Sequence, residues 1–104
     1  MGVDWSKRHG YIASRSVRRP GDTDIDPQWA NEALTDPHRR LFDPDYASQS
    51  GQSLRTIGWS QTAGMLLTVI TVRYAGRIYG ANAWRAGRTD QRHYQEGLDD
   101  DQRK

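Results

Sequence analysis

The chain has 104 residues, of which 35% are hydrophobic and 27% are charged, and it contains no cysteine. A chain of this length is expected to form one small domain, and without cysteine it can form neither disulfides nor thiolate metal sites. The only strongly apolar run, residues 65–72, is far shorter than the roughly 20 residues that span a bilayer, so no membrane segment is predicted. No apolar stretch follows the first charged residues, and we therefore expect no signal peptide and a cytoplasmic location.

Arginine dominates the positive charge of the chain. The formal net charge is +2, and 13 of the 15 basic residues are arginines. Arginine is favoured where a planar guanidinium group grips a phosphate or a carboxylate. The charges fall in blocks, because residues 7–19 are basic whereas residues 22–26 and 99–101 are acidic. Such blocks are more often solvated segments than binding sites.

The first helix is predicted over residues 4–18. Trp5, His9 and Ile12 are spaced by four and then three residues, which places them on one narrow apolar stripe of a helix. The pair Pro20-Gly21 follows and is expected to interrupt regular structure.

A second helix is predicted over residues 27–36. Asp26 is a suitable N-cap, and Pro27 fits the first helical position, where its missing N–H group costs nothing. The Asp-Pro pair at residues 36–37 is expected to end this helix, because proline disfavours helical backbone in the residue before it.

After residue 37 the pattern of apolar residues changes to the period of two that is typical of strands. Four strands are predicted, at residues 38–43, 54–60, 65–73 and 77–84. The third strand is apolar on both faces, so we expect it to be central in the sheet. Gly80, inside the fourth strand, indicates a close approach of another stretch of backbone or a bulge.

A short helix is predicted to follow the last strand. Thr89 can cap it, Asp90 suits the positive end of its dipole, and Gly97 suits its C-terminal end. Residues 99–104 are then expected to form a disordered acidic tail.

These elements predict an α+β domain over residues 1–98. Short loops between the last three strands indicate an antiparallel meander of three to four strands, with the N-terminal helices on one face. Residues 1–24 are expected to form a basic helical extension and a loop, and the C-terminal helix is short.

Several stretches between residues 25 and 98 follow the pattern of a known family. Residues 25–37 are IDPQWANEALTDP, residues 54–60 are LRTIGWS, residues 64–72 form an apolar strand, and NAWRA at 82–86 precedes Asp90 and Tyr94. In order and spacing these stretches resemble the BrnT family of small toxins, which have a RelE-like ribonuclease fold. The resemblance covers about seventy per cent of the chain, and it leads us to expect a RelE/BrnT-like fold.

The resemblance implies a toxin of a type II toxin–antitoxin system. Such a protein would be a metal-independent endoribonuclease that inhibits translation by cleaving messenger RNA, with no cofactor. Its partners would be RNA and a cognate antitoxin protein, in a complex that can contain a toxin homodimer, and no membrane would be involved.

Two alternatives to a toxin stay open. The chain has Asp22-Thr23-Asp24 where the family usually has Lys-His-Gly, and Trp84 where an arginine is usual. These departures favour a non-catalytic BrnT-like module that binds protein or nucleic acid. A further alternative is a nucleic-acid binder that uses the basic N-terminal segment.

Six residues near the joint between sheet and last helix are candidates for an RNA site. The catalytic candidates are Arg55, Arg85 and Tyr94, and the RNA-binding candidates are Trp84, Arg88 and Arg92. Arginine can hold phosphate, aromatic rings can stack on bases, and a phenol can donate a proton.

Each candidate also has a structural interpretation. Arg55 can neutralise phosphate charge in a transition state, or it can form a salt bridge to an acidic residue: Asp43, Asp45 or Asp90. Trp84 can stack on a base or pack in the core. Tyr94 can donate a proton or pack against the body of the protein, and the exposed arginines can simply keep the surface soluble.

A metal site is not predicted. His9, His38 and His93 lie in three different predicted elements, and no H-E-x-x-H spacing or similar ligand pattern occurs.

Overall fold

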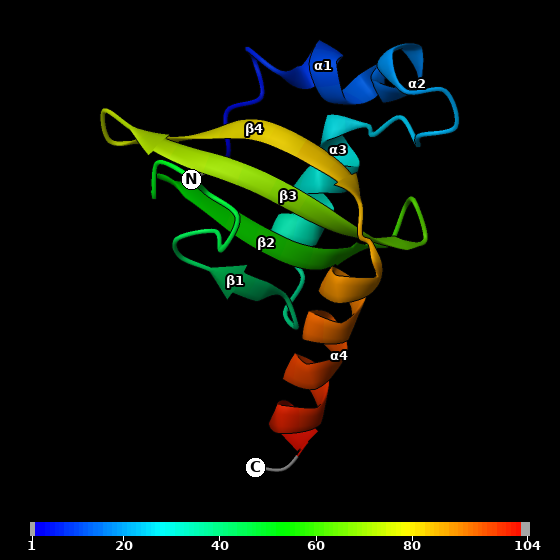
Figure 1. Cartoon of the computed structure of the whole chain (residues 1–104), viewed down its shortest axis with the longest axis vertical. Coiled ribbons are helices and arrows are strands. Elements are labelled where there is room, and N and C mark those ends of the chain that lie inside the picture. Colours follow the sequence, from blue (N-terminus) through cyan, green and yellow to red (C-terminus); the bar gives the residue numbers. More distant parts are fainter. Residues whose placement is uncertain (1, 103–104) are drawn as a thin grey trace.

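The protein folds as an α+β domain around one antiparallel sheet. The computed structural model describes residues 2–102, with only the backbone described for residues 101–102. Four strands lie in the order of the chain (Figure 1): β1 (Arg40–Phe42), β2 (Ser53–Ser60), β3 (Met65–Tyr74) and β4 (Arg77–Arg85). This arrangement confirms the predicted meander and the central place of its third strand.

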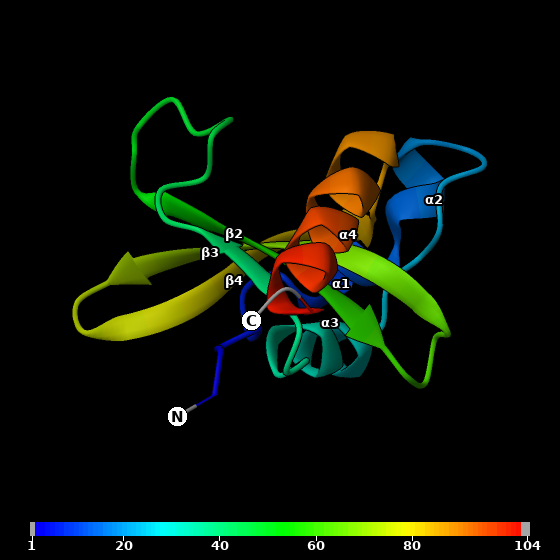
Figure 2. The ribbon, with the colours of Figure 1, turned by 90° about the horizontal axis from the view of Figure 1, so that it is seen from below.

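Helices lie on both sides of the sheet. They are α1 (His9–Ala13), α2 (Arg15–Arg18), α3 (Pro27–Leu34) and α4 (Arg88–Gln102). α3 covers one face, α1 and α2 lie beside β4, and α4 leaves the end of β4 on the side opposite α3 (Figures 1 and 2). None of the helices in the described part of the chain has the length and apolar character needed to cross a bilayer.

α3 begins at Pro27, as the sequence predicts, and the predicted N-cap is present. The Asp26 side chain accepts a hydrogen bond of 2.8 Å from the backbone N–H of Gln28, and Pro27 is the first helical residue. The helix ends at Leu34, slightly before the predicted limit.

The main core lies between the sheet and α3. Its buried members come from the N-terminal segment, α3, β3 and β4: Trp5, Ile12, Ile25, Ala30, Ala33, Leu67, Val69 and Ala83. Fully burying a side chain such as Ile12 contributes about 1.5–3 kcal/mol. Glycine at position 58 permits the close packing of α3, because a Cβ there would lie 2.0 Å from the Ala33 carbonyl oxygen.

Gly80 has both roles that its place in the strand predicted. The pairing of β3 with β4 shifts by one residue beside it, which is a bulge. Another stretch of backbone also lies close, since the Gly80 N–H donates to the Asp4 carbonyl at 2.8 Å. The Trp5 ring packs onto Gly80 as well, because a Cβ there would lie 2.3 Å from that ring.

The predicted helix over residues 4–18 is wrong in extent. Asp4 forms a parallel bridge with Tyr79, so the chain is extended there, and helix begins only at His9. Ser14 then separates α1 from α2. The segment follows the edge of β4 because Trp5 is drawn into the core, a long-range contact that helical periodicity does not report.

The predicted end of the last helix at Gly97 is also wrong. α4 continues to Gln102, and Gly97 lies inside it against the aliphatic stem of Arg40. Of the tail predicted to be disordered, residues 99–102 are therefore helical, whereas residues 103–104 lie outside the described residues.

Candidate functional site

The face of the sheet opposite α3, here called the open face, carries two of the predicted site residues, Arg55 and Trp84. Strand pairing places Arg55 beside Ile70, Ile70 beside Asn82, and Thr68 beside Trp84. Side chains of paired residues lie on the same face, so these residues all belong to the open face. The loop before β2 and the first turn of α4 cover part of it.

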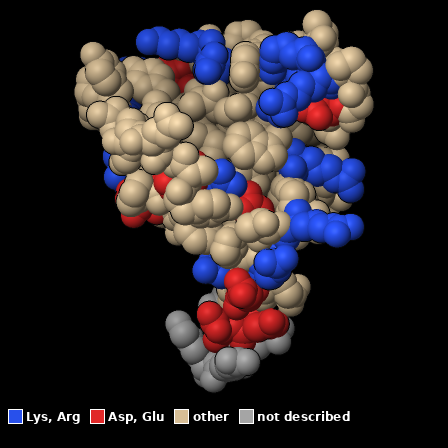
Figure 3. All heavy atoms as spheres, viewed as in Figure 1, with Lys and Arg blue, Asp and Glu red and all other residues tan. Residues whose placement is uncertain are grey.

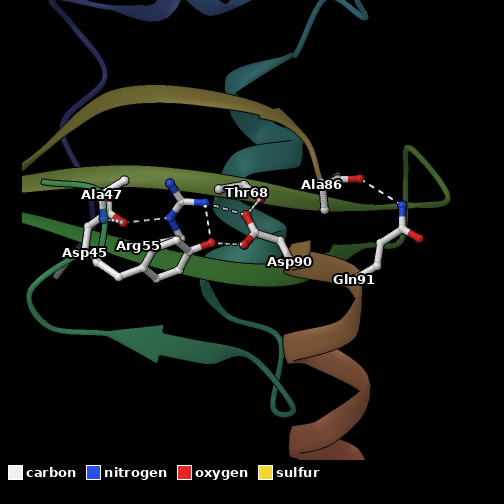
Figure 4. A network of polar contacts seen from close by, with 8 residues as sticks. Asp45, Ala47, Arg55, Thr68, Ala86, Asp90 and Gln91 are labelled. Carbon is white, nitrogen blue, oxygen red and sulfur yellow. Dashed lines mark hydrogen bonds and ion pairs between the residues drawn. The ribbon is translucent and has the colours of Figure 1, made fainter. Parts of the chain in front are cut away.

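Arg55 lies at the centre of a buried polar network on this face (Figure 4). Its Nε donates to Asp45 Oδ1 at 2.8 Å, and its Nη1 donates to Asp90 Oδ2 at 2.6 Å. The Tyr46 hydroxyl donates to Asp90 Oδ1 at 2.5 Å, and the Thr68 hydroxyl donates to Asp90 Oδ2 at 2.6 Å. Arg55 is only 8% exposed, so one guanidinium group is enclosed by two carboxylates.

The titration of Asp90 reflects these contacts. Burial disfavours the carboxylate and would raise the pKa of Asp90. The hydrogen bonds from Thr68 and Tyr46, together with the positive charge of Arg55, outweigh burial and hold that pKa below its ordinary value. Asp90 therefore stays charged, and Arg55 is the ion-pair partner of both acids, which is the structural interpretation offered by the sequence.

Tyr94 lies outside this network and bonds to Asp36. Its hydroxyl donates to Asp36 Oδ2 at 2.6 Å, and Asp36 also accepts backbone N–H groups from Trp59 and His38 at 2.8 and 2.9 Å. Burial and the Asp36 carboxylate raise the pKa of Tyr94 well above its ordinary value. The hydroxyl thus fastens α4 to the end of α3 and holds its proton strongly.

A cleft between α1–α2 and β4 gathers the basic residues of the N-terminal segment. We call it the arginine cleft. It consists of two adjoining hollows of about 330 and 350 Å³, lined by Tyr11, Arg15, Arg18, Arg19, Gly21, Asp22, Thr23, Asn82, Trp84 and Arg85. Four arginines face one carboxylate among these lining residues. Figure 3 shows basic side chains over α2 and along the side where β4 passes into α4.

Arg15 organises the wall of the cleft. Its Nη1 donates to Asn82 Oδ1 at 3.0 Å and to the Ala83 carbonyl at 3.3 Å, and its Nη2 pairs with Asp22 Oδ2 at 3.1 Å. These contacts fix α2 to β4. Arg19 and Arg85 are exposed and form no ion pair with any described residue, so their guanidinium groups are available to a ligand.

Trp84 lies where the arginine cleft meets the buried network. The side chain is half-buried, and the centre of its ring lies 5.8 Å from Arg15 Cζ and 5.5 Å from Arg55 Cζ. The indole is therefore held by two cations while part of it lines the cleft. This position combines the two interpretations that the sequence left open for Trp84.

The structure separates the three catalytic candidates. No hydrogen bond or ion pair joins any two of Arg55, Arg85 and Tyr94; each has different neighbours. Arg85 and Trp84 meet in the arginine cleft, whereas Arg88 and Arg92 are exposed on α4 and line neither of its hollows.

No motif in the sequence distinguishes Tyr11, Arg15, Arg18 or Arg19 from the other residues of the N-terminal segment. The basic block at residues 7–19 was the available signal. It was interpreted mainly as a solvated segment, and as a nucleic-acid-binding segment only in one alternative. Among the described residues, no group of three or more histidine or acidic side chains could hold a metal ion.

Comparison of the chain with protein-family models, with curated proteins and with solved structures finds no match. The resemblance to the BrnT family therefore stays a prediction from the sequence pattern.

Proposed function

We propose that the protein is a small cytoplasmic toxin that acts on RNA, of the type II toxin–antitoxin class. The observation that carries this proposal is the arginine cleft, whose lining includes four arginines and a partly exposed indole. Arginine on phosphate and an aromatic ring on a base are the contacts by which proteins bind single-stranded RNA. The resemblance of residues 25–98 to the BrnT family supplies the class and implies a cognate antitoxin.

The cleft offers groups for metal-independent cleavage of RNA. In that reaction the 2′-oxygen attacks the adjacent phosphorus and its proton passes to a base. The bond from phosphorus to the 5′-oxygen breaks, the 5′-oxygen takes a proton from water, and a 2′,3′-cyclic phosphate remains. Arg19 and Arg85 can stabilise the phosphoryl oxygens. Asp22 is the carboxylate that lines the cleft, and it can accept the 2′-hydroxyl proton. Arg15 positions Asp22 through their ion pair.

Growth and RNA integrity test this proposal together. Induced expression in a bacterium should arrest growth, and the purified protein should cleave RNA in the presence of a chelator. The double variant Arg19→Ala/Arg85→Ala should relieve the arrest and weaken RNA binding. Arg39→Ala is the matched control, because it removes one exposed arginine just before β1, at the other edge of the sheet. Normal growth with the wild-type protein, and no binding to RNA, would refute the proposal.

A specific observation favours a second candidate, a non-catalytic module of the same fold. Arg55 is committed to Asp45 and Asp90, and Tyr94 is committed to Asp36. A protein of this kind would bind RNA or a protein partner without cutting RNA. Intact RNA on a gel, with binding that still depends on Arg19 and Arg85, would select this candidate.

A further inference from the structure

A second hollow lies on the open face, at the end where β3 turns into β4. We call it the hairpin hollow. It has a volume of about 440 Å³, and its wall includes Lys7, Arg8, Val72, Tyr74 and Tyr79. Nothing in the proposed catalytic chemistry uses these residues.

The bulge in β4 brings this hollow onto the same face as the arginine cleft. Strict alternation would place Tyr79 and Asn82, three residues apart, on opposite faces. The shift in pairing leaves Tyr79 beside Val72 and Asn82 beside Ile70. Val72 and Ile70 are two residues apart on β3, so Tyr79 and Asn82 both face the open side.

The side chains of the hairpin hollow suit a base and a phosphate. Tyr74 is 73% exposed, and Lys7 Nζ lies 5.2 Å from the centre of the Tyr79 ring. The described lining includes three cationic side chains and no carboxylate, although one of them, Arg73, is paired with Asp43 outside the hollow. Exposed aromatic rings beside cations are the platform on which proteins stack successive bases of a single strand.

The two sites are joined along β4. Arg8 lines the hairpin hollow, its Cζ lies 4.3 Å from the ring of Tyr11 in the arginine cleft, and its Nε donates to the Ala81 carbonyl. Tyr79 and Trp84 pair with β3 residues four positions apart, which corresponds to about 13 Å at about 3.3 Å per residue. Stacked bases of one strand advance about 3.4 Å each, so this span is about four base steps.

We infer that a single RNA strand lies along β4, with its phosphates in the arginine cleft and a base several nucleotides away stacked on Tyr79 and Tyr74. This inference rests on the proposed function, because it extends the RNA site to a second contact. It assigns the hairpin hollow to single-stranded RNA, because the cations of its wall complement phosphates and its exposed rings complement bases.

The dependence of affinity on RNA length tests the inference. Fluorescence anisotropy would use labelled 2′-O-methyl oligouridylates of two to eight nucleotides, which cannot be cleaved. Wild-type affinity should rise sharply once the oligonucleotide spans both sites. The double variant Tyr74→Ala/Tyr79→Leu should bind the shortest oligonucleotide like wild type and the longer ones about 5- to 150-fold more weakly, the range expected for a lost base stack.

Two controls accompany this measurement. Trp59→Ala removes another exposed aromatic side chain of the open face, on β2, and should leave the length dependence unchanged. Tyr79→Phe keeps the ring and should keep the affinity. If the double variant does not fold, Tyr74→Ala alone carries the test, because that side chain is largely exposed.

The possible failures are distinct. Wild-type binding whose length dependence survives in the tyrosine variants would overturn the hairpin hollow as an RNA site and leave the arginine cleft in place. The same result is expected if the hollow receives a protein segment instead. Absence of binding at every length would overturn both the inference and the proposed function.

Discussion

Replacing Arg55 by methionine separates the two interpretations of this residue. The substitution keeps much of the buried volume but removes the cation that contacts Asp45 at 2.8 Å and Asp90 at 2.6 Å. Two carboxylates then remain in a buried site without a positive charge. Breaking a buried ion pair in this way costs about 3–5 kcal/mol of the free energy of unfolding, so the thermal midpoint of a domain of this size should fall by roughly 12 °C or more.

Denaturation followed by circular dichroism measures this loss. The control is Arg77→Met. Arg77 is exposed and its ion pair with Asp4 is loose, at 3.8 Å, so its removal should leave the free energy of unfolding nearly unchanged. Adding Asp90→Asn to Arg55→Met should recover part of the loss, because one uncompensated charge disappears. A stable Arg55→Met protein that no longer cleaves RNA would refute this reasoning and make Arg55 a phosphate ligand.

Three further outcomes follow from the contacts. Tyr94→Phe should lower the free energy of unfolding by about 1–2 kcal/mol and leave RNA binding unchanged; a loss of cleavage without a loss of stability would contradict this. The pKa of Asp90 is lower in the folded protein than in the unfolded chain, where an aspartate has a pKa of about 4. The contribution of Asp90 to stability is therefore fully present above about pH 4 and is lost as the pH falls through the lower pKa of the folded state. Acid titrations of unfolding should therefore be flatter for Asp90→Asn than for wild type. Gly58→Ala should destabilise by about 1–3 kcal/mol or more, since its Cβ would lie 2.0 Å from a backbone carbonyl oxygen of α3. Gly87→Ala, whose Cβ would meet nothing within 4 Å, is its control in the same denaturation assay.

Local signals predicted most of the elements. The start of α3 follows from Asp26 and Pro27, β2 follows from its period of two, and β3 follows from its continuous apolar run. Where the prediction was wrong, a distant contact competed with a local preference. Trp5 packs on Gly80 and stops helix from forming at the start of the chain, and the stem of Arg40 covers Gly97 so that α4 continues past it.

The candidate site was predicted less completely than the fold. Trp84 and Arg85 do line a basic cleft at the end of β4. Most of its arginines, however, come from the N-terminal segment, for which binding was only one alternative to a solvated role. The ion-pair partners of Arg55 also depended on the fold, because the sequence offered several acidic residues as possible partners. A charged residue in the middle of a strand needs either an oppositely charged partner or a solvent-exposed face. The sequence does not show which of the two it has, or which residue the partner is.

The amino-acid sequence by itself determined the order of helices and strands, the central place of β3 and the charge available for binding. These properties arise from capping groups and side-chain periods that act over a few neighbouring residues. Only the tertiary structure decided that Arg55 is enclosed while the arginines of the N-terminal segment line a cleft. Those outcomes depend on contacts between residues 35 positions apart, as for Arg55 and Asp90, or 67 apart, as for Arg15 and Asn82, and such pairs meet only when the whole sheet has formed.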